Sequence, residues 1–292
     1  MPKVLVIGDL MIDHYLWGSA NRISPEAPVQ VVDIDNESTV LGGAGNVVNN
    51  LRALGCNVGV ISAIGKDEAG SELKEMLNSI ETKSYLIEQS NRKTSKKSRI
   101  IASHSQVVRY DKESKEDITE ESCHAIFEEF KFIVEDYDIV LLSDYGKGVL
   151  TSKLTLNLIE YANSKNKRVL VDPKGDDYSK YFGAYLLTPN KKEAQEATKI
   201  DIKNNDSLLD ALQSLKQTAN LTIPLITLSE DGIAILDENN KIINKPTVAR
   251  EVYDVTGAGD TVLASLGYCL AQNLDIGKSL EFANLAAGVV VG

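Results

Sequence analysis

Small residues and a carboxylate stand together in one stretch near the end of the chain, Asp254-Val255-Thr256-Gly257-Ala258-Gly259-Asp260-Thr261. The stretch follows a β-rich run and precedes an apolar run at 262–270 that is typical of a buried helix. The first N–H groups of a helix lack intrahelical acceptors and carry the positive end of its dipole, so Gly257, Ala258 and Gly259 could bring backbone against an anion. Asp260 could then take the proton of a hydroxyl that attacks a phosphate. The competing interpretation is an ordinary helix start with an Asp in its first turn.

A second glycine-rich stretch lies early in the chain, where a helical pattern at 47–54 follows Gly42-Gly43-Ala44-Gly45-Asn46. Such a stretch can bring backbone against a small polar ligand, and the Asn46 amide offers both donors and an acceptor. Asp13, which follows the first strand pattern, could accept hydrogen bonds from sugar hydroxyls. The alternatives are a glycine-rich turn into a helix and a surface or capping Asp. No third glycine follows in register, so the stretch is not a dinucleotide fingerprint.

A third motif, Asn190-Lys191-Lys192-Glu193, follows a strand pattern and Pro189. Residues three apart share one face in the first turn of a helix, so Asn190 and Glu193 can act together. The Glu193 carboxylate could hold Mg²⁺ through water, as Mg²⁺ prefers when it also binds phosphates. The alternative is a capping box, in which Asn190 and Glu193 only close the start of the helix.

The densest group of basic residues in this acidic chain lies at 92–99, and Arg109 could join it from the next strand pattern. A phosphate on the substrate would explain the group, with Lys97, Arg99 and Arg109 as its ligands. The alternative is a solvated loop, which is the usual role of a run of charges.

Strand and helix patterns alternate through most of the chain. Repeated strand–helix units predict an α/β fold with a mostly parallel sheet and helices on both faces. Ligands in such folds lie beyond the carboxyl ends of the strands. Four polar residues directly follow strand patterns and are expected at that edge: Asp9, Asp144, Asp172 and Asn190.

Composition excludes several classes of protein. The 292 residues carry 31 Lys and Arg against 42 Asp and Glu, a formal net charge of −11, which argues against nucleic acid or an anionic membrane as the main partner. The three cysteines form no CxxC pair, which indicates free thiols in a reducing cytoplasm rather than a metal site. There is no signal-peptide pattern and no apolar run of membrane-spanning length. We expect the natural chain to continue beyond the apolar stretch at 286–292.

Taken together, the two glycine-rich stretches and Asn190-x-x-Glu193 resemble the signatures of the PfkB (ribokinase-like) sugar kinases. The resemblance covers essentially the whole chain. Residues 8–13, 22–29 and 143–148 are similar to the kinase domains that phosphorylate D-glycero-β-D-manno-heptose 7-phosphate at its C1 hydroxyl, on the route to ADP-heptose for lipopolysaccharide. In many relatives that domain is fused to a C-terminal nucleotidyltransferase, so we expect 1–292 to be a single kinase domain that stops before such a segment.

The resemblance implies a role for each matching residue. Asp260 is the implied base, with Gly257, Ala258 and Gly259 as the anion hole. The residues expected to bind the sugar are Asp13, Gly42, Gly43, Asn46 and Asp144; for the 7-phosphate we add Lys97, Arg99 and Arg109, which the resemblance does not itself imply. Those expected to line the ATP side are Asn190, Lys191, Lys192, Glu193, Ser229, Gly232 and Asn284, with Glu193 toward Mg²⁺.

The resemblance further implies a ribokinase-like central sheet, a small β-sheet lid at about 15–35 and 94–110, and a homodimer formed through that lid. ATP and Mg²⁺ would be required, and a requirement for a monovalent cation stays open. The alternatives are a kinase for another phosphosugar or a nucleoside, and a catalytically silent sugar or nucleotide sensor. A dehydrogenase is disfavoured because the nicotinamide fingerprint is missing.

Overall fold

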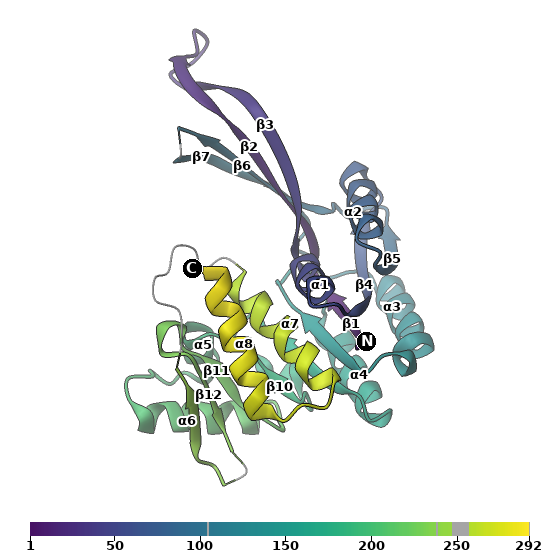
Figure 1. The fold of residues 1–292 in the computed structure, drawn as a ribbon. Helices are drawn as coiled ribbons and strands as arrows, with labels where there is room; N and C mark the ends of the chain where they lie inside the picture. The colour runs from purple at the N-terminus through teal and green to yellow at the C-terminus, as the bar shows by residue number, and fades with distance from the viewer. Residues whose placement is uncertain (104, 238, 247–256, 292) are drawn as a thin grey trace.

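The computed structural model describes residues 1–292 except positions 104, 238, 247–256 and 292. A central sheet of six parallel strands runs through it in the order β10–β9–β8–β1–β4–β5 (Figure 1). Most of its strands have apolar, buried interiors, as expected when helices cover both faces of a parallel sheet. In chain order the strands are β1 (Lys3–Gly8), β4 (Asn57–Gly65), β5 (Lys83–Gln89), β8 (Ile139–Ser143), β9 (Arg168–Asp172) and β10 (Leu186–Leu187).

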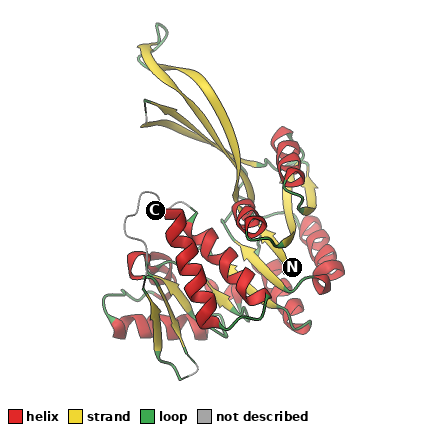
Figure 2. Ribbon diagram, viewed as in Figure 1, coloured by secondary structure: helices red, strands yellow, loops and turns green. Residues whose placement is uncertain are grey.

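Helices pack on both faces of the central sheet (Figure 2). Successive side chains of a strand point to opposite faces, so in β1 Val4 and Val6 belong to one core cluster and Leu5 and Ile7 to the other. The first cluster includes α1 (Ala44–Ala53), α2 (Glu68–Ser79), α7 (Ala258–Ala271) and α8 (Ile276–Val291). The second includes α3 (Glu120–Ile133), α4 (Ser152–Ser164), α5 (Lys191–Thr198) and α6 (Asn205–Thr218).

A separate four-stranded sheet, here called the outer sheet, extends away from the body of the molecule (Figure 1). Its order is β3–β2–β6–β7, and β2 runs parallel to β6 while the other neighbours are antiparallel. The segments expected at 15–35 and 94–110 fall mostly within it, but β2 and β3 reach further, to the edge of the central sheet. The strands are β2 (Leu10–Ile23), β3 (Gln30–Gly43), β6 (Ser95–Ala102) and β7 (Ser105–Lys112).

A small antiparallel sheet completes the fold beside β10, formed by β11 (Leu225–Thr227), β12 (Ile233–Leu236) and β13 (Ile242–Lys245). The expected α/β architecture, with a mostly parallel sheet and an additional β-sheet, is therefore confirmed. Two elements, β5 and α8, are absent from the expectations, and the β-rich run expected before residue 256 lies outside the described residues. Among the helices that the structure describes, none is long and apolar enough to cross a membrane.

Candidate active site

Asp260 lies in the first turn of α7, and its side chain is almost fully buried, with 5% of the residue exposed. Asn46 Nδ2 donates to its Oδ2 at 2.7 Å, and the Tyr145 hydroxyl donates to its Oδ1 at 2.8 Å. Burial raises the pKa of Asp260, whereas these two donors lower it because they favour the charged form. The site therefore holds a buried, oriented carboxylate that can accept a proton.

The start of α7 has the small residues that the sequence singled out. Gly257 adopts a left-handed conformation, φ +81°, and a Cβ added there would approach Asn46 Nδ2 to 2.9 Å. Ala258 and Gly259 line the main cavity, and a Cβ added at Gly259 would meet nothing within 4 Å. The helix dipole is positive at this end, so the turn suits an anion. The anion hole expected at 257–259 stays a prediction, and Asp254 to Thr256 lie outside the described residues.

Residues expected to bind the sugar lie at the base of the outer sheet and at the start of α1. Asp13 on β2 lies in register with Lys97 on β6, and Arg99 lies two residues further along the same face. Arg99 Nη1 donates to Asp13 Oδ1 at 2.6 Å. A Cβ added at Gly42 would come within 2.0 Å of Asp13 Oδ2, so only glycine leaves room for this carboxylate. Gly43 ends the strand with φ +56° and delivers the chain into α1, where Asn46 reaches Asp260.

The three cations expected to bind a sugar phosphate differ in their partners. Arg99 is paired with Asp13, and Arg109 forms a two-point contact with Asp111, at 2.9 and 2.8 Å. Lys97 forms no ion pair with any residue that the structure describes, and its ammonium lies 5.7 Å from the centre of the Tyr145 ring. Its partial burial lowers the pKa of Lys97, although the nearby Asp13 opposes that shift. Lys97 is thus the cation best placed to accept an incoming anion.

The buried carboxylate of Asp9 holds the loop after β8 through hydrogen bonds to its backbone. Asp9, which directly follows β1, accepts backbone N–H groups from Tyr145, Lys147 and Val149 at 2.9, 3.1 and 3.1 Å. Asp144 in the same loop is also buried, and its oxygens accept from Lys180, Tyr181 and the backbone of Gly146. Asp144 therefore engages protein groups on both oxygens, and the sugar contact expected of it stays a prediction.

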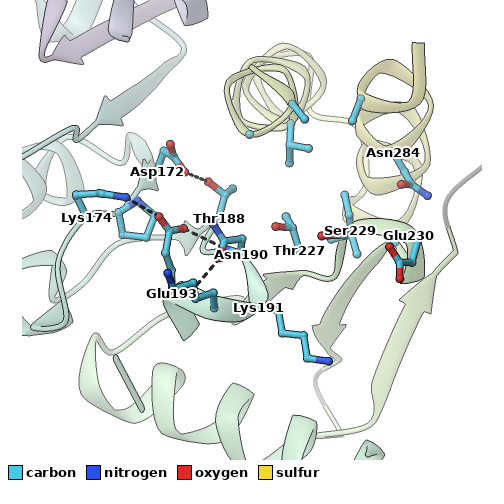
Figure 3. Close-up of a pocket in the computed structure, with 18 of the residues that line it drawn as sticks. Asp172, Lys174, Thr188, Asn190, Lys191, Glu193, Thr227, Ser229, Glu230 and Asn284 are labelled. Atoms are coloured by element: carbon cyan, nitrogen blue, oxygen red, sulfur yellow. Dashed lines mark hydrogen bonds and ion pairs between the residues drawn. The ribbon is translucent and has the colours of Figure 1, made fainter. Parts of the chain in front are cut away.

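A cavity of about 690 Å³ opens beyond the carboxyl ends of β8, β9 and β10, beside the start of α7 (Figure 3). Figure 3 shows Asn190, Glu193 and Lys174 linked to one another along one wall, while Ser229, Glu230 and Asn284 lie on the opposite side. Every residue expected on the ATP side lines this cavity, so sequence-distant motifs converge as expected: Asn190, Lys191, Lys192, Glu193, Ser229, Gly232 and Asn284.

Asn190 and Glu193 form a capping box at the start of α5, which was the competing interpretation of that motif. Asn190 Oδ1 accepts the Glu193 N–H at 3.0 Å, and Glu193 Oε2 accepts the Asn190 N–H at 3.1 Å. Glu193 Oε1 also accepts from Lys174 Nζ at 2.9 Å. No cluster of three or more His, Cys, Asp or Glu side chains suited to a metal occurs among the described residues. Both oxygens of Glu193 thus already accept hydrogen bonds from the protein, and the Mg²⁺ contact through water that the sequence predicts for it stays a prediction.

The structure places two further residues, Tyr145 and Asp172, at the candidate site, to which the sequence analysis gave no role. Tyr145 bonds the proposed base, and Asp172 lines the cavity with its Oδ1 accepting from Thr188 Oγ1 at 2.9 Å. The Asp172 carboxyl lies deep among protein atoms although the residue touches the cavity, and this burial, together with the Asp260 charge, raises its pKa to about 8. The sequence signal that could have pointed to both residues is their position at the carboxyl ends of strands: Asp172 ends β9, and Tyr145 lies two residues after β8.

The chain matches the model of the pfkB family carbohydrate kinases over residues 1–292. It belongs to this family. The bifunctional protein HldE of Aliarcobacter butzleri (strain RM4018) is 63% identical over 292 residues, which is 100% of this chain and 61% of that protein. HldE of Sulfurimonas denitrificans (strain ATCC 33889 / DSM 1251) is 60% identical, with the same coverage. The chain therefore spans about three fifths of the length of these curated relatives.

Solved structures support the same architecture. The tetrameric inhibited form of phosphofructokinase-2 from Escherichia coli superposes with a TM-score of 0.83 at 18% identity, covering 100% of this chain and 94% of that one. Arabidopsis thaliana ribokinase, solved with ribose and ATP, superposes with a TM-score of 0.75 at 18% identity, covering 99% of this chain and 92% of that one. At this identity the likeness concerns the fold, and it confirms the ribokinase-like architecture expected from the sequence.

Proposed function

We propose that this chain transfers the γ-phosphoryl group of ATP to the C1 hydroxyl of D-glycero-β-D-manno-heptose 7-phosphate, giving the 1,7-bisphosphate for ADP-heptose synthesis. The observation that carries the proposal is the position of Asp260. It bonds Asn46, which follows the sugar-side glycines, and it directly follows Ala258 and Gly259, which line the ATP-side cavity. A buried carboxylate between two such regions suits a base in phosphoryl transfer.

The mechanism follows from what these groups can do. Transfer of a phosphoryl group passes through a loose transition state, so positioning and charge stabilisation dominate catalysis. Asp260 accepts the proton of the acceptor hydroxyl, and the start of α7 stabilises the charge on the transferring oxygens. Mg²⁺, held near Glu193, supplies further positive charge to the ATP phosphates when it is bound.

Lys97 supports a phosphorylated sugar as the acceptor. Its ammonium lies over Tyr145, which bonds Asp260, and it has no ion-pair partner among the described residues. A second negative group on the sugar would provide that partner. The identity of 60–63% to the HldE proteins of Aliarcobacter butzleri and Sulfurimonas denitrificans supports the heptose phosphate in particular.

The test is a coupled assay of ADP release with heptose 7-phosphate, fructose 6-phosphate and ribose as acceptors. We expect the highest kcat/KM with heptose 7-phosphate and a higher KM for the same heptose without its phosphate. Equal or better turnover of another acceptor would make the chain a PfkB kinase of different specificity. Ligand-induced thermal stabilisation with no ADP release from any acceptor would instead identify a sugar or nucleotide sensor.

A further inference from the structure

Tyr145 occupies a position that packing alone does not explain. Its hydroxyl donates to Asp260 Oδ1 at 2.8 Å, while its ring is only partly buried and lines the cavity. Burial and the charge of Asp260 raise the pKa of Tyr145, so the phenol keeps its proton and acts as a donor to the carboxylate. A tyrosine needed only for packing has no requirement for this bond.

The backbone around Tyr145 is held rigidly. Its N–H is bound by Asp9 Oδ2 at 2.9 Å, and the same carboxylate binds two further N–H groups of the loop. Arg92 adds a second anchor, because its guanidinium donates to the carbonyls of Lys147 and Glu116. Since both anchors are buried, the loop presents the Tyr145 hydroxyl at a fixed place.

We propose that Tyr145 is a positioning residue for phosphoryl transfer, whose hydroxyl holds the Asp260 carboxylate in a single orientation toward the acceptor sugar. The inference rests on the function proposed above for Asp260. Asn46 donates to one carboxylate oxygen and Tyr145 to the other, so the two bonds together prevent rotation of the group. Each oxygen retains a second lone-pair site, which is available to the proton of the acceptor hydroxyl.

The same bond favours the ionised form of Asp260. Burial raises the pKa of Asp260, and the charges that face it are Asp13 on β2, Lys97 on β6 and Asp172 on β9. Asp13 and Asp172 oppose ionisation, Lys97 favours it, and the Asn46 and Tyr145 donors favour it as well. Without the Tyr145 hydroxyl, fewer groups offset the effect of Asp13 and Asp172, so the pKa of Asp260 should rise.

The test compares Tyr145→Phe with wild type and with Tyr178→Phe. The phenylalanine keeps the ring beneath Lys97 and removes only the hydroxyl. Tyr178 is the control, because its hydroxyl has no hydrogen-bond partner among the described residues, although the residue is fully buried in the second core cluster. In protein labelled with ¹³C at the Asp carboxyl carbon, the Asp260 signal is assigned by its loss in Asp260→Asn.

We expect the titration midpoint of Asp260 to rise by about one pH unit in Tyr145→Phe and to stay unchanged in Tyr178→Phe. The acid limb of kcat/KM should move up by the same amount, with kcat on the plateau reduced about tenfold and KM for ATP unchanged. An unmoved midpoint in Tyr145→Phe would overturn the inference, whatever the activity. A midpoint that moves in Tyr145→Phe, together with a wild type that phosphorylates no sugar, would support the Tyr145–Asp260 coupling and overturn the proposed function instead.

Discussion

At the scale of single residues, the central claim is that Asp260 acts as a base and not as an ordinary residue in the first turn of a helix. Asp260→Asn keeps the size of the side chain but replaces one accepting oxygen with an NH2 group, so it can accept only one of the two bonds from Asn46 and Tyr145 and cannot take the proton. We expect kcat to fall by about 10²–10⁴-fold while the affinity for sugar and ATP stays within a few fold. Steady-state kinetics and calorimetric binding measure the two effects separately.

The matched control for this prediction is Asp206→Asn. Asp206 also lies in the first turn of a helix, α6, but it is exposed and far in sequence from every expected site residue. Its substitution should leave kcat unchanged. Normal turnover by Asp260→Asn would remove Asp260 from the role of base and leave it as part of an anion-binding turn.

At the scale of elements, Gly232 shows how a turn shapes the cavity wall. It has φ +91°, and an added Cβ would lie 1.9 Å from the Lys245 carbonyl oxygen, between β12 and β13. Gly55 has a similar φ of +83° but open space around it. Gly55→Ala should therefore lower the free energy of unfolding by about 1 kcal/mol through backbone strain alone. Gly232→Ala should cost about 1–3 kcal/mol more, because the neighbouring strand must move.

Urea denaturation of the two variants measures this difference. ATP binding should weaken in Gly232→Ala but not in Gly55→Ala, because Gly232 lines the cavity and Gly55 does not. Equal losses of stability would mean that β13 moves freely and that the close approach of the added Cβ to the Lys245 carbonyl oxygen has no energetic cost.

The elements also show how far the sequence could predict this fold. Alternating strand and helix patterns were sufficient for the central sheet, because buried parallel strands and capped helices leave strong local signals. Strand β5 was not predicted, since it lies at the edge of the sheet and is half-buried along most of its length. Helix α8 combines glycine with β-branched residues near its end, which weakens a helical pattern.

The site was predictable only in part, and the reason is distance along the chain. Asp260, Asn46 and the motif at 190–193 could be proposed as site residues from the sequence because each stands in a short pattern. The Tyr145–Asp260 bond joins residues 115 apart, and nothing local distinguishes that tyrosine from one that packs in the core. Likewise, the sequence could not show that Arg99 and Arg109 already have acidic partners whereas Lys97 has none among the described residues.

At the scale of the whole molecule, we propose that a second copy of this chain covers part of the outer sheet, as the family resemblance implies. The sheet exposes large apolar side chains, among them Val40, Val108 and Tyr110, each at least 46% accessible. Sedimentation velocity should show a dimer for wild type. Val108→Asp should shift it toward monomer, because a buried unpaired charge at an interface is costly.

Phe132→Asp is the control for the dimer, since Phe132 is 86% exposed on α3, on the body of the molecule rather than on the outer sheet. It should leave the sedimentation coefficient unchanged. A monomeric wild type at micromolar concentration, or dissociation by Phe132→Asp and not by Val108→Asp, would contradict an interface through the outer sheet.

Asp172 makes the stability of the whole molecule depend on pH. Its pKa is raised from 3.8 to about 8 on folding, so between these values the folded chain holds a proton that the unfolded chain releases. The contribution of this carboxyl to stability is therefore complete below the unfolded pKa and is lost as pH rises toward 8, with a slope of up to about 1.4 kcal/mol per pH unit. Asp172→Asn stays neutral and should lack this slope.

Urea denaturation at pH 6 and pH 8 measures the effect as a difference between two proteins, in which the other titrating groups cancel. Wild type should lose more stability than Asp172→Asn over this interval, by about 2 kcal/mol. Thr188→Val removes the hydroxyl that donates to Asp172 Oδ1 and favours the charged form, which raises the folded-state pKa further, so its loss of stability should continue to a higher pH than in wild type. Parallel curves for wild type and Asp172→Asn would mean that Asp172 is already ionised in the folded chain at pH 6, and that the cavity hydrates its carboxylate despite the depth at which it lies.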